Sequence, residues 1–266
     1  MYKRQIEHAG IPGEWGFCAY IEQNGKKLLL DTGASNLFAE NAEKLNIDLK
    51  DIDFAVLSHA HYDHANGMEK FFEINRKAPF YLQEGCGENC YFKKGFIRKY
   101  IGIPKGITKK YQDRIKYVSG VYTVADGIYL VSHSTPHLEQ IGKKEMMYQK
   151  TKLGWKPDNF CHEQSLVLDT DGGLVIFNSC SHGGVVNIIN EVKAAFPNKK
   201  ITALIGGFHI FKHPEAEIRE LAKLIKETGI QRIYTGHCSK ERGYRILREE
   251  LGDMAGQFYV GMELEF

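Results

Sequence analysis

The sequence predicts a layered α/β fold, and two observations lead to this prediction. Short β-prone runs bounded by turn residues alternate along the chain with segments whose apolar residues recur at helical spacing. At 266 residues the chain is long enough to bury a substantial core, and no linker marks independent parts. We therefore expect a single domain over residues 1–266 in which helices pack on sheets.

Composition narrows the class of protein. The 35 basic and 33 acidic residues nearly balance, which does not indicate a general binder of polyanions. No apolar stretch approaches the ~18–20 residues that cross a bilayer. Residues 1–7 lack the apolar core of a secretory signal. We expect a cytoplasmic protein that does not enter membranes.

The expected elements follow in chain order. Residues 15–22 and 27–31 are predicted strands, and Asn24-Gly25 between them predicts a type I′ hairpin turn. A short buried strand at 54–57 is expected between helices at 35–45 and 68–74. Residues 141–158 are polar and irregular, which predicts a long loop or flap. The remaining expected strands are 79–83, 128–131, 166–168, 174–177, 201–206, 231–234 and 257–263, with helices at 185–192, 215–227 and 240–251.

Three histidines and one aspartate occur within six residues directly after the predicted strand at 54–57. They are His59, His61, Asp63 and His64. His59 and His61 can project to one side of an extended segment, whereas the next two residues enter a helix and face a second point nearby. Imidazole and carboxylate groups are preferred ligands of zinc and neighbouring metals. The spacing predicts two adjacent metal ions rather than one.

Asp31, at the end of the predicted strand 27–31, is a candidate partner for this loop. Its carboxylate can accept hydrogen bonds and orient a ligand histidine. It can also form an Asx-turn or cap before the helix predicted at 35–45. The sequence leaves both roles open.

The pattern His59-x-His61-x-Asp63-His64 resembles the signature of the metallo-β-lactamase superfamily. Other motifs extend the likeness over most of the chain: Asp31-Thr32-Gly33, Ser179-Cys180-Ser181-His182-Gly183-Gly184, Gly206-Gly207-Phe208-His209 and Gly236-His237-Cys238. They are similar to a narrower branch named after an archaeal dihydropterin–ribofuranosylaminobenzene phosphate synthase. The resemblance implies an αββα sandwich that holds one or two metal ions.

The resemblance also implies a set of metal ligands. The first metal would be held by His59, His61 and His182, and the second by Asp63, His64 and His237. Zinc is expected, two ions per chain, with Mn²⁺ or Fe²⁺ as alternatives. Histidine rather than glutamate at position 61 argues against the oxygen-reducing di-iron relatives.

The sequence departs from the superfamily's commonest pattern around the hairpin predicted at 166–177. That pattern has a histidine at the start of the hairpin and a metal-bridging aspartate at its end. In this chain His162 stands near the first place and Cys180 near the second. The third ligand of the first metal is therefore His182, which we favour, or His162. A thiolate bridge from Cys180 also stays open.

Positive charge is concentrated between residues 91 and 117, where nine Lys or Arg and six aromatic residues stand against one acid. We interpret residues at about 85–158 as an inserted basic cap or flap over the metal site. Its field would attract an anionic substrate, with Lys93, Lys94 and Arg98 as substrate-binding residues. A solvated face and a platform for single-stranded nucleic acid are the alternative interpretations, and nucleic acid is the least favoured of the three.

The six cysteines are scattered through a chain that does not need disulfides at this size. Cys86 and Cys90 are the only pair that is close in the sequence. They suit a redox or metal pair, but no second pair lies near them, and two free thiols are the favoured interpretation.

Together these residues predict a metal-dependent hydrolase that acts on an anionic small-molecule ester, such as a phosphodiester or a lactone, through metal-activated water. Asp63 is expected to accept the proton of the attacking water. His209 follows the strand predicted at 201–206 and is a candidate substrate contact or proton donor. The branch resemblance implies an alternative, a transferase that joins a pterin methyl diphosphate to an aminobenzene ribose phosphate.

Overall fold

The computed structural model describes residues 10–266, so the prediction made for residues 1–7 lies outside the described part of the chain. The described residues form two compact units. The seven-stranded unit contains residues 10–13, 121–131 and 165–266, and the five-stranded unit contains residues 14–120 and 132–164. Among the described helices, none combines the length and the apolar character that a membrane crossing requires.

The main sheet of the five-stranded unit begins with the predicted hairpin. Strands β1 (Ala19–Gln23) and β2 (Lys26–Leu30) are antiparallel, and the turn residues Asn24 and Gly25 have φ of 49° and 71°, as a type I′ turn requires. Three further strands pair in parallel in the order β2-β3-β4-β7. They are β3 (Phe54–Val56), β4 (Phe80–Gln83) and β7 (Ile115–Val118).

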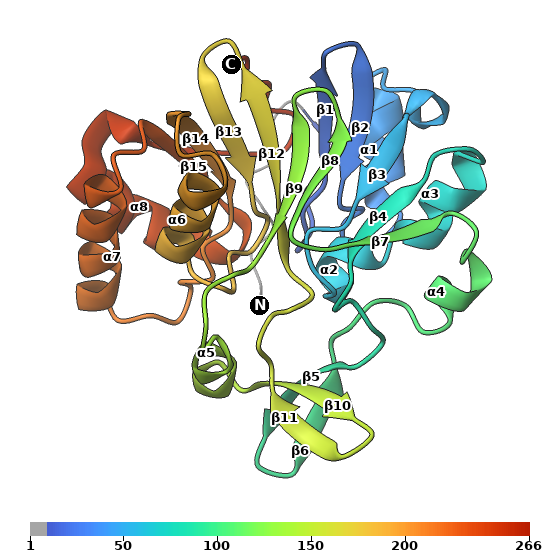
Figure 1. Ribbon diagram of the computed structural model, residues 1–266, viewed down its shortest axis with the longest axis horizontal. Coiled ribbons are helices and arrows are strands. Elements are labelled where there is room, and N and C mark those ends of the chain that lie inside the picture. The colour runs from blue at the N-terminus through green and yellow to red at the C-terminus, as the bar shows by residue number, and fades with distance from the viewer. Residues whose placement is uncertain (1–9) are drawn as a thin grey trace. The chain divides into compact units, whose positions relative to one another are not determined.

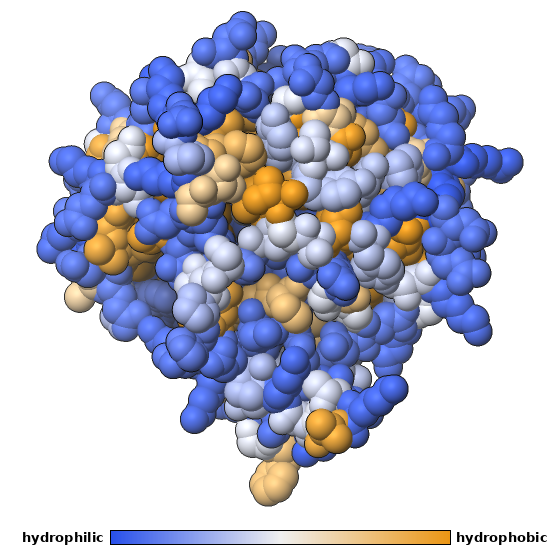
Figure 2. Space-filling model, viewed as in Figure 1, coloured by the Kyte–Doolittle hydropathy of each residue, from blue (hydrophilic) through white to orange (hydrophobic). Residues whose placement is uncertain are grey.

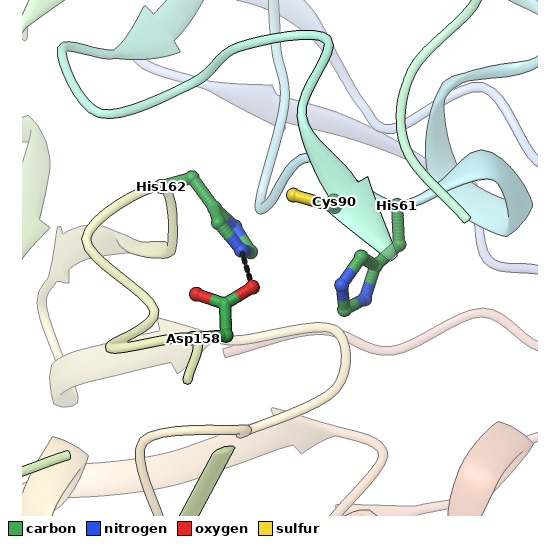
Figure 3. Close-up of side chains that lie close together, drawn as sticks. All are labelled: His61, Cys90, Asp158 and His162. Atoms are coloured by element: carbon green, nitrogen blue, oxygen red, sulfur yellow. Dashed lines mark hydrogen bonds and ion pairs between the residues drawn. The ribbon is translucent and has the colours of Figure 1, made fainter. Parts of the chain in front are cut away.

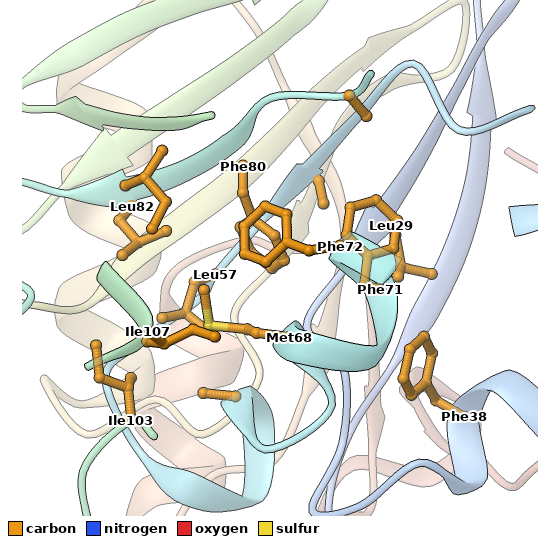
Figure 4. Packing of buried hydrophobic residues seen from close by; sticks show 14 of the residues in the cluster. Leu29, Phe38, Leu57, Met68, Phe71, Phe72, Phe80, Leu82, Ile103 and Ile107 are labelled. Atoms are coloured by element: carbon orange, nitrogen blue, oxygen red, sulfur yellow. The ribbon is translucent and has the colours of Figure 1, made fainter. Parts of the chain in front are cut away.

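Short helices complete this unit and bury an aromatic core against the sheet (Figure 4). In the core, the Phe71 ring meets the Phe80 ring edge-on at 5.6 Å between centroids. Met68 and Leu57 are fully buried beside them. The helices are α1 (Leu37–Lys44), η1 (Leu49–Asp51), α2 (Tyr62–Ala65), α3 (Met68–Ile74) and α4 (Ile107–Lys110). This core holds β3 in place, and β3 carries the predicted metal-binding loop.

A separate four-stranded antiparallel sheet also belongs to the five-stranded unit (Figure 1). Its strands, in order, are β11 (Gly154–Pro157), β10 (Met147–Thr151), β5 (Cys90–Lys94) and β6 (Ile97–Tyr100), and helix α5 (Glu139–Lys144) precedes β10. The prediction that residues 141–158 form a loop is therefore wrong. Met147 and Gln149 are buried while Lys150 is exposed, so a real strand alternation was masked by the many lysines.

The predicted basic insertion at about 85–158 is only partly a separate structure. Strand β7 belongs to the main sheet of its unit, and β8 (Val121–Ala125) and β9 (Ile128–Ser132) belong to the seven-stranded sheet. Lys93, Lys94 and Arg98 lie on β5 and β6 of the four-stranded sheet, where Lys93 sits over the Tyr148 ring. Apolar side chains stand out against the hydrophilic surface of this sheet in Figure 2, and Phe96 and Leu153 are its most exposed ones.

The seven-stranded unit has the strand order β16-β15-β14-β13-β12-β9-β8. Strands β12 (Gln164–Thr170) and β13 (Gly173–Phe177) form the predicted hairpin. From β13 onward the strands β14 (Ile201–Gly206), β15 (Arg232–Thr235) and β16 (Ala255–Gln257) are parallel, and parallel strands need crossover connections. Helices α6 (Val185–Ala195), α7 (Glu215–Glu227) and α8 (Lys240–Leu251) supply them, with the short turns η2 (His237–Ser239) and η3 (Gly252–Met254).

The apolar faces of these three helices pack with the sheet into a second core, which includes Ile176, Ile188, Leu204, Ile218 and Leu247. The prediction of an α/β fold is confirmed by this arrangement. The predicted edge strand at 257–263 is wrong, because β16 ends at Gln257 and residues 258–266 form no strand.

Candidate metal centre

The predicted ligand loop of the five-stranded unit brings its donor side chains together. The His59 ring lies 4.7 Å from the His61 ring and 4.2 Å from the His64 ring, measured between centroids. The Asp63 Oδ2 and His64 Nε2 atoms are 3.7 Å apart. All four side chains belong to buried residues. Buried imidazoles that gather beside a carboxylate form a donor set suited to zinc and related metals.

Asp31 orients this loop through a buried relay of hydrogen bonds. The Asp31 Oδ2 atom accepts hydrogen bonds from the Ser58 hydroxyl and from His64 Nδ1, both at 2.7 Å. Asp31 Oδ1 accepts the Ser58 backbone N–H at 2.7 Å. Because the Ser58 hydroxyl donates to Asp31, it accepts from His59 Nδ1 at 2.8 Å. These hydrogen bonds hold the rings of His59 and His64 with the proton on Nδ1. In each ring Nε2 then keeps the lone pair that a metal needs.

The two roles left open for Asp31 are therefore resolved. Its orientation of a ligand-type histidine is confirmed by the contact with His64. Asp31 does not cap the helix, because the Leu37 N–H that begins α1 donates to Ser35 Oγ, and Glu14 Oε1 accepts the backbone N–H groups of Ala34 and Ser35 ahead of it. Asp31 also has φ of 60°, a left-handed conformation that a non-glycine residue adopts at a cost and that is frequent at functional sites.

The electrostatics of the loop favour a neutral imidazole at His61. Burial lowers the pKa of His61 to about 3. A neutral ring offers a lone pair to a metal at ordinary pH without first losing a proton.

His162 lies beside the loop, and its ring faces Asp158 (Figure 3). Both of its ring nitrogens are hydrogen-bonded. Nδ1 accepts the backbone N–H of Ala60 at 3.1 Å, and Nε2 pairs with Asp158 Oδ2 at 3.1 Å. A ring whose Nδ1 accepts an N–H carries its single proton on Nε2. A metal could bind at either nitrogen only by breaking one of these two hydrogen bonds.

The segment from 158 to 164 clamps the backbone of the ligand loop at two further points. The Gln164 backbone N–H donates to Ser58 O at 2.8 Å, and its side chain donates to Leu57 O at 2.9 Å. Asp158 accepts in turn from the Gln149 side chain and the Phe160 backbone, at 2.9 and 2.8 Å. Sequence reasoning missed this clamp. Its one signal was the polar run Cys161-His162-Glu163-Gln164 directly before β12.

Two thiols near the clamp, those of Cys86 and Cys90, are buried. Burial raises the pKa of Cys86 to about 12 and also raises the pKa of Cys90. The Cys86 thiol donates to His162 O at 3.3 Å. None of the six cysteines, all of which lie among the described residues, forms a disulfide, which agrees with the favoured interpretation of Cys86 and Cys90 as two free thiols.

The seven-stranded unit presents its own donor side chains at the carboxyl ends of three parallel strands. His182 follows β13, His209 follows β14 and His237 follows β15. The rings of His182 and His209 are 4.4 Å apart between centroids, and His182 and His237 are buried. Cys180 and Cys238 are buried on the same loops, and Cys238 Sγ accepts the backbone N–H of His209 at 3.2 Å.

Buried polar side chains and close backbone packing shape these loops. Asn178 Oδ1 accepts the Ser181 N–H at 2.8 Å, and the Ser239 hydroxyl accepts the Phe208 N–H at 2.9 Å. A Cβ atom on Gly206 would lie 1.8 Å from Asn178 O, so only glycine fits there. Ser181, His209 and His237 all have φ between 46° and 53°. Three strained residues at neighbouring strand ends are typical of a functional edge.

The Cys238 thiol has an unusual acidity. Burial raises its pKa, but the hydrogen bond with Cys180 and the nearby imidazoles of His237 and His209 outweigh that effect. The net pKa lies well below the ordinary value for a thiol. A thiolate is the form of cysteine that binds metals.

Comparisons with known proteins place this geometry in a wider context. The model of the metallo-β-lactamase superfamily matches residues 15–142. The 7,8-dihydropterin-6-methyl-4-(β-D-ribofuranosyl)-aminobenzene-5′-phosphate synthase of Methanocaldococcus jannaschii is 28% identical, over 94% of this chain and 88% of its own. An uncharacterized protein of the same organism is 26% identical, over 87% of this chain and 85% of its own. The crystal structure of a metal-dependent hydrolase of the β-lactamase superfamily superposes on this chain with a TM-score of 0.84. The match covers 99% of this chain and 96% of the hydrolase, whose sequence is 26% identical.

Proposed function

From the metallo-β-lactamase fold of this chain, and its similarity over nearly its whole length to a metal-dependent hydrolase of the β-lactamase superfamily, we propose a metal-dependent hydrolase that acts on an anionic small-molecule ester. The observation that carries the proposal is the Asp31 relay. It holds the rings of His59 and His64 with Nδ1 protonated, so that Nε2 carries the lone pair that a metal needs. A relay of this kind serves ligand histidines and has little purpose in a polar surface loop.

We propose two metal positions, with zinc as the metal. The first would be held by His59, His61 and His182, and the second by Asp63, His64 and His237. His182 rather than His162 is proposed as the third ligand of the first metal, because both ring nitrogens of His162 are hydrogen-bonded within the clamp. The metals, when bound, would bring the pKa of a bound water to about 7 and polarise an oxygen of the substrate.

Side chains of this protein would carry out the proton transfers and attract the substrate. Asp63 would accept the proton of the attacking water, for which it is placed on the same buried loop as the ligands. His209 would contact the substrate or donate a proton to the leaving group. Lys93, Lys94 and Arg98, on a sheet whose β5, β6, β10 and β11 strands contain no acidic residue, would attract the anionic group.

The test starts from full-length protein that has been freed of metal by chelation and reloaded with zinc or manganese. We expect hydrolysis of the reporter bis(4-nitrophenyl) phosphate by the reloaded protein only. His59→Ala should abolish hydrolysis and lower the metal content. The matched control is His137→Ala, because the side chain of His137 is 73% exposed. No hydrolysis of phosphodiester or lactone reporters at any metal loading would contradict the proposal.

A transferase is the second candidate, and one observation favours it. The relative from Methanocaldococcus jannaschii that matches 94% of this chain is named as a synthase. In such a reaction the same ligands would hold metals that bind a departing diphosphate. Incubation with a pterin methyl diphosphate and an aminobenzene ribose phosphate should then release diphosphate only when both substrates are present. Diphosphate release from the pterin alone would instead favour the hydrolase.

A further inference from the structure

Two thiols and one imidazole converge at the carboxyl edge of the seven-stranded sheet. Cys180, His209 and Cys238 come from the loops after β13, β14 and β15, and one donor atom from each lies within 4.8 Å of the other two. We propose that these three side chains bind a thiophilic divalent cation such as Zn²⁺. The proposal goes beyond the proposed function, because neither sulfur is among its six ligands and the binding does not require hydrolysis.

The backbone next to Cys180, His209 and Cys238 leaves space for the Cys238 sulfur atom. A Cβ atom at position 207 would lie 2.4 Å from the Cys238 sulfur, so Gly207 provides the room that this side chain occupies. The next residues in the chain, Phe208 and His209, are fixed by hydrogen bonds to the Ser239 hydroxyl and to Cys238 Sγ. The loops after β14 and β15 are thus tied to each other at the donor atoms themselves.

The donor types select the class of ligand. Thiolate and imidazole groups suit zinc and cobalt, whereas Mg²⁺ and Ca²⁺ prefer oxygen. On binding, each thiol releases its proton to solvent as its sulfur forms a bond to the ion, so no oxidant or reductant is needed. His209 would bind through one ring nitrogen and keep its proton on the other. Three protein ligands leave a fourth position open, as in sites that exchange water or substrate.

A group of metal-type side chains that lies wholly within the five-stranded unit lacks these properties. His61, Cys90, Asp158 and His162 also place their donor atoms within 4.8 Å of one another (Figure 3). There, however, the His162 ring accepts the Ala60 N–H and pairs with Asp158, so an ion would have to break the clamp. This group therefore supplies the control rather than a second proposal.

The test titrates metal-free, fully reduced full-length protein with Co²⁺ and follows the sulfur-to-cobalt charge-transfer absorption in the near ultraviolet. We expect this band in the parent, a clear loss in Cys180→Ser and Cys238→Ser, and none in the double variant. Cys86→Ser and Cys90→Ser are matched controls, since these cysteines are also buried but belong to the other unit, and they should keep the band. Absence of the band in the parent, or its persistence in the double variant, would overturn the proposal.

Two further measurements keep the result interpretable. Because a serine variant can misfold, the parent protein is also tested. The rate of cysteine alkylation is measured by mass spectrometry with and without zinc, and zinc should slow the labelling of Cys180 and Cys238 at least tenfold. Equal labelling with and without zinc would overturn the proposal. His59→Ala should lose hydrolysis and keep the charge-transfer band. Failure of the thiolate site and failure of the proposed hydrolase are therefore seen in different readouts.

Discussion

The ligand loop of the five-stranded unit and the donor edge of the seven-stranded unit display similar side chains but are built in different ways. In the loop, four donors lie within six residues, and one buried carboxylate, Asp31, orients two of them. At the edge, each donor comes from a separate strand, and buried Ser and Asn side chains and glycines hold the loops. The comparison suggests that the loop depends on hydrogen-bond chemistry, whereas the edge depends on close backbone packing.

Among the substitutions, the largest effect is expected from removing the carboxylate of the loop. Asp31→Ala would leave the Ser58 N–H, the Ser58 hydroxyl and His64 Nδ1 without their acceptor in a buried site. We expect the free energy of unfolding to fall by roughly 2–4 kcal/mol and metal affinity to fall about 100-fold. Denaturant titration and competition with a chelator measure the two effects. Asp31→Asn keeps one acceptor oxygen and should lie between parent and Ala, and a parent-like Ala variant would refute the relay.

The edge should be most sensitive to added volume. In Gly206→Ala the new Cβ would meet Asn178 O at 1.8 Å, at a residue whose φ is 157°. We expect roughly 2–3 kcal/mol of destabilisation in thermal or chemical unfolding. The matched control is Gly172→Ala in the turn between β12 and β13, where the Cβ would make only an ordinary contact with Thr170 Oγ1 at 3.5 Å. Equal stability of the two variants would show that backbone packing does not govern this edge.

The buried imidazole of the loop predicts a pH dependence for the metal-free protein. His61 has a pKa of about 3 in the fold against 6.5 ordinarily, so below pH 6.5 the unfolded chain binds a proton that the folded chain does not. Stability should therefore be complete above pH 6.5 and fall by about 1.4 kcal/mol per pH unit as the pH is lowered toward 3. Urea titrations at several pH values measure the slope. His61→Gln should flatten the slope, and an unchanged slope would assign the effect to other groups.

The smallest effect is expected from substitutions at His162 in the clamp. Comparing them with His182→Ala tells a residue that positions the loop from a residue that binds the metal. His162→Leu removes the acceptor for the Ala60 N–H, so the loop should bind metal with about tenfold lower affinity at unchanged stoichiometry. His162→Gln, which can still accept a hydrogen bond, should recover part of the affinity. His182→Ala should instead lower the number of metal ions bound per chain, as measured by metal analysis. A loss of stoichiometry in His162→Leu with full metal in His182→Ala would reverse the ligand assignment.

Several features could be predicted from the sequence because their signals are local. The Asn24-Gly25 turn, the buried strand β3 and the ligand pattern from His59 to His64 each depend on residues a few positions apart. The contact of Asp31 with His64 was foreseen only as one of two roles. The β10–β11 hairpin was missed, because its lysines hide the alternation of buried Met147 and Gln149.

What the sequence determined by itself is the α/β class and the candidate donors of the ligand loop, since alternation, turn chemistry and motif spacing depend on short stretches of the chain. Only the tertiary structure showed which residues contact each other, and therefore which structural role each of them has. His162 became a support of the loop through a hydrogen bond to Ala60, 102 residues away. Cys180, His209 and Cys238 became one donor set through the parallel order of β13, β14 and β15. Such roles depend on strand pairing and burial, which no local pattern encodes.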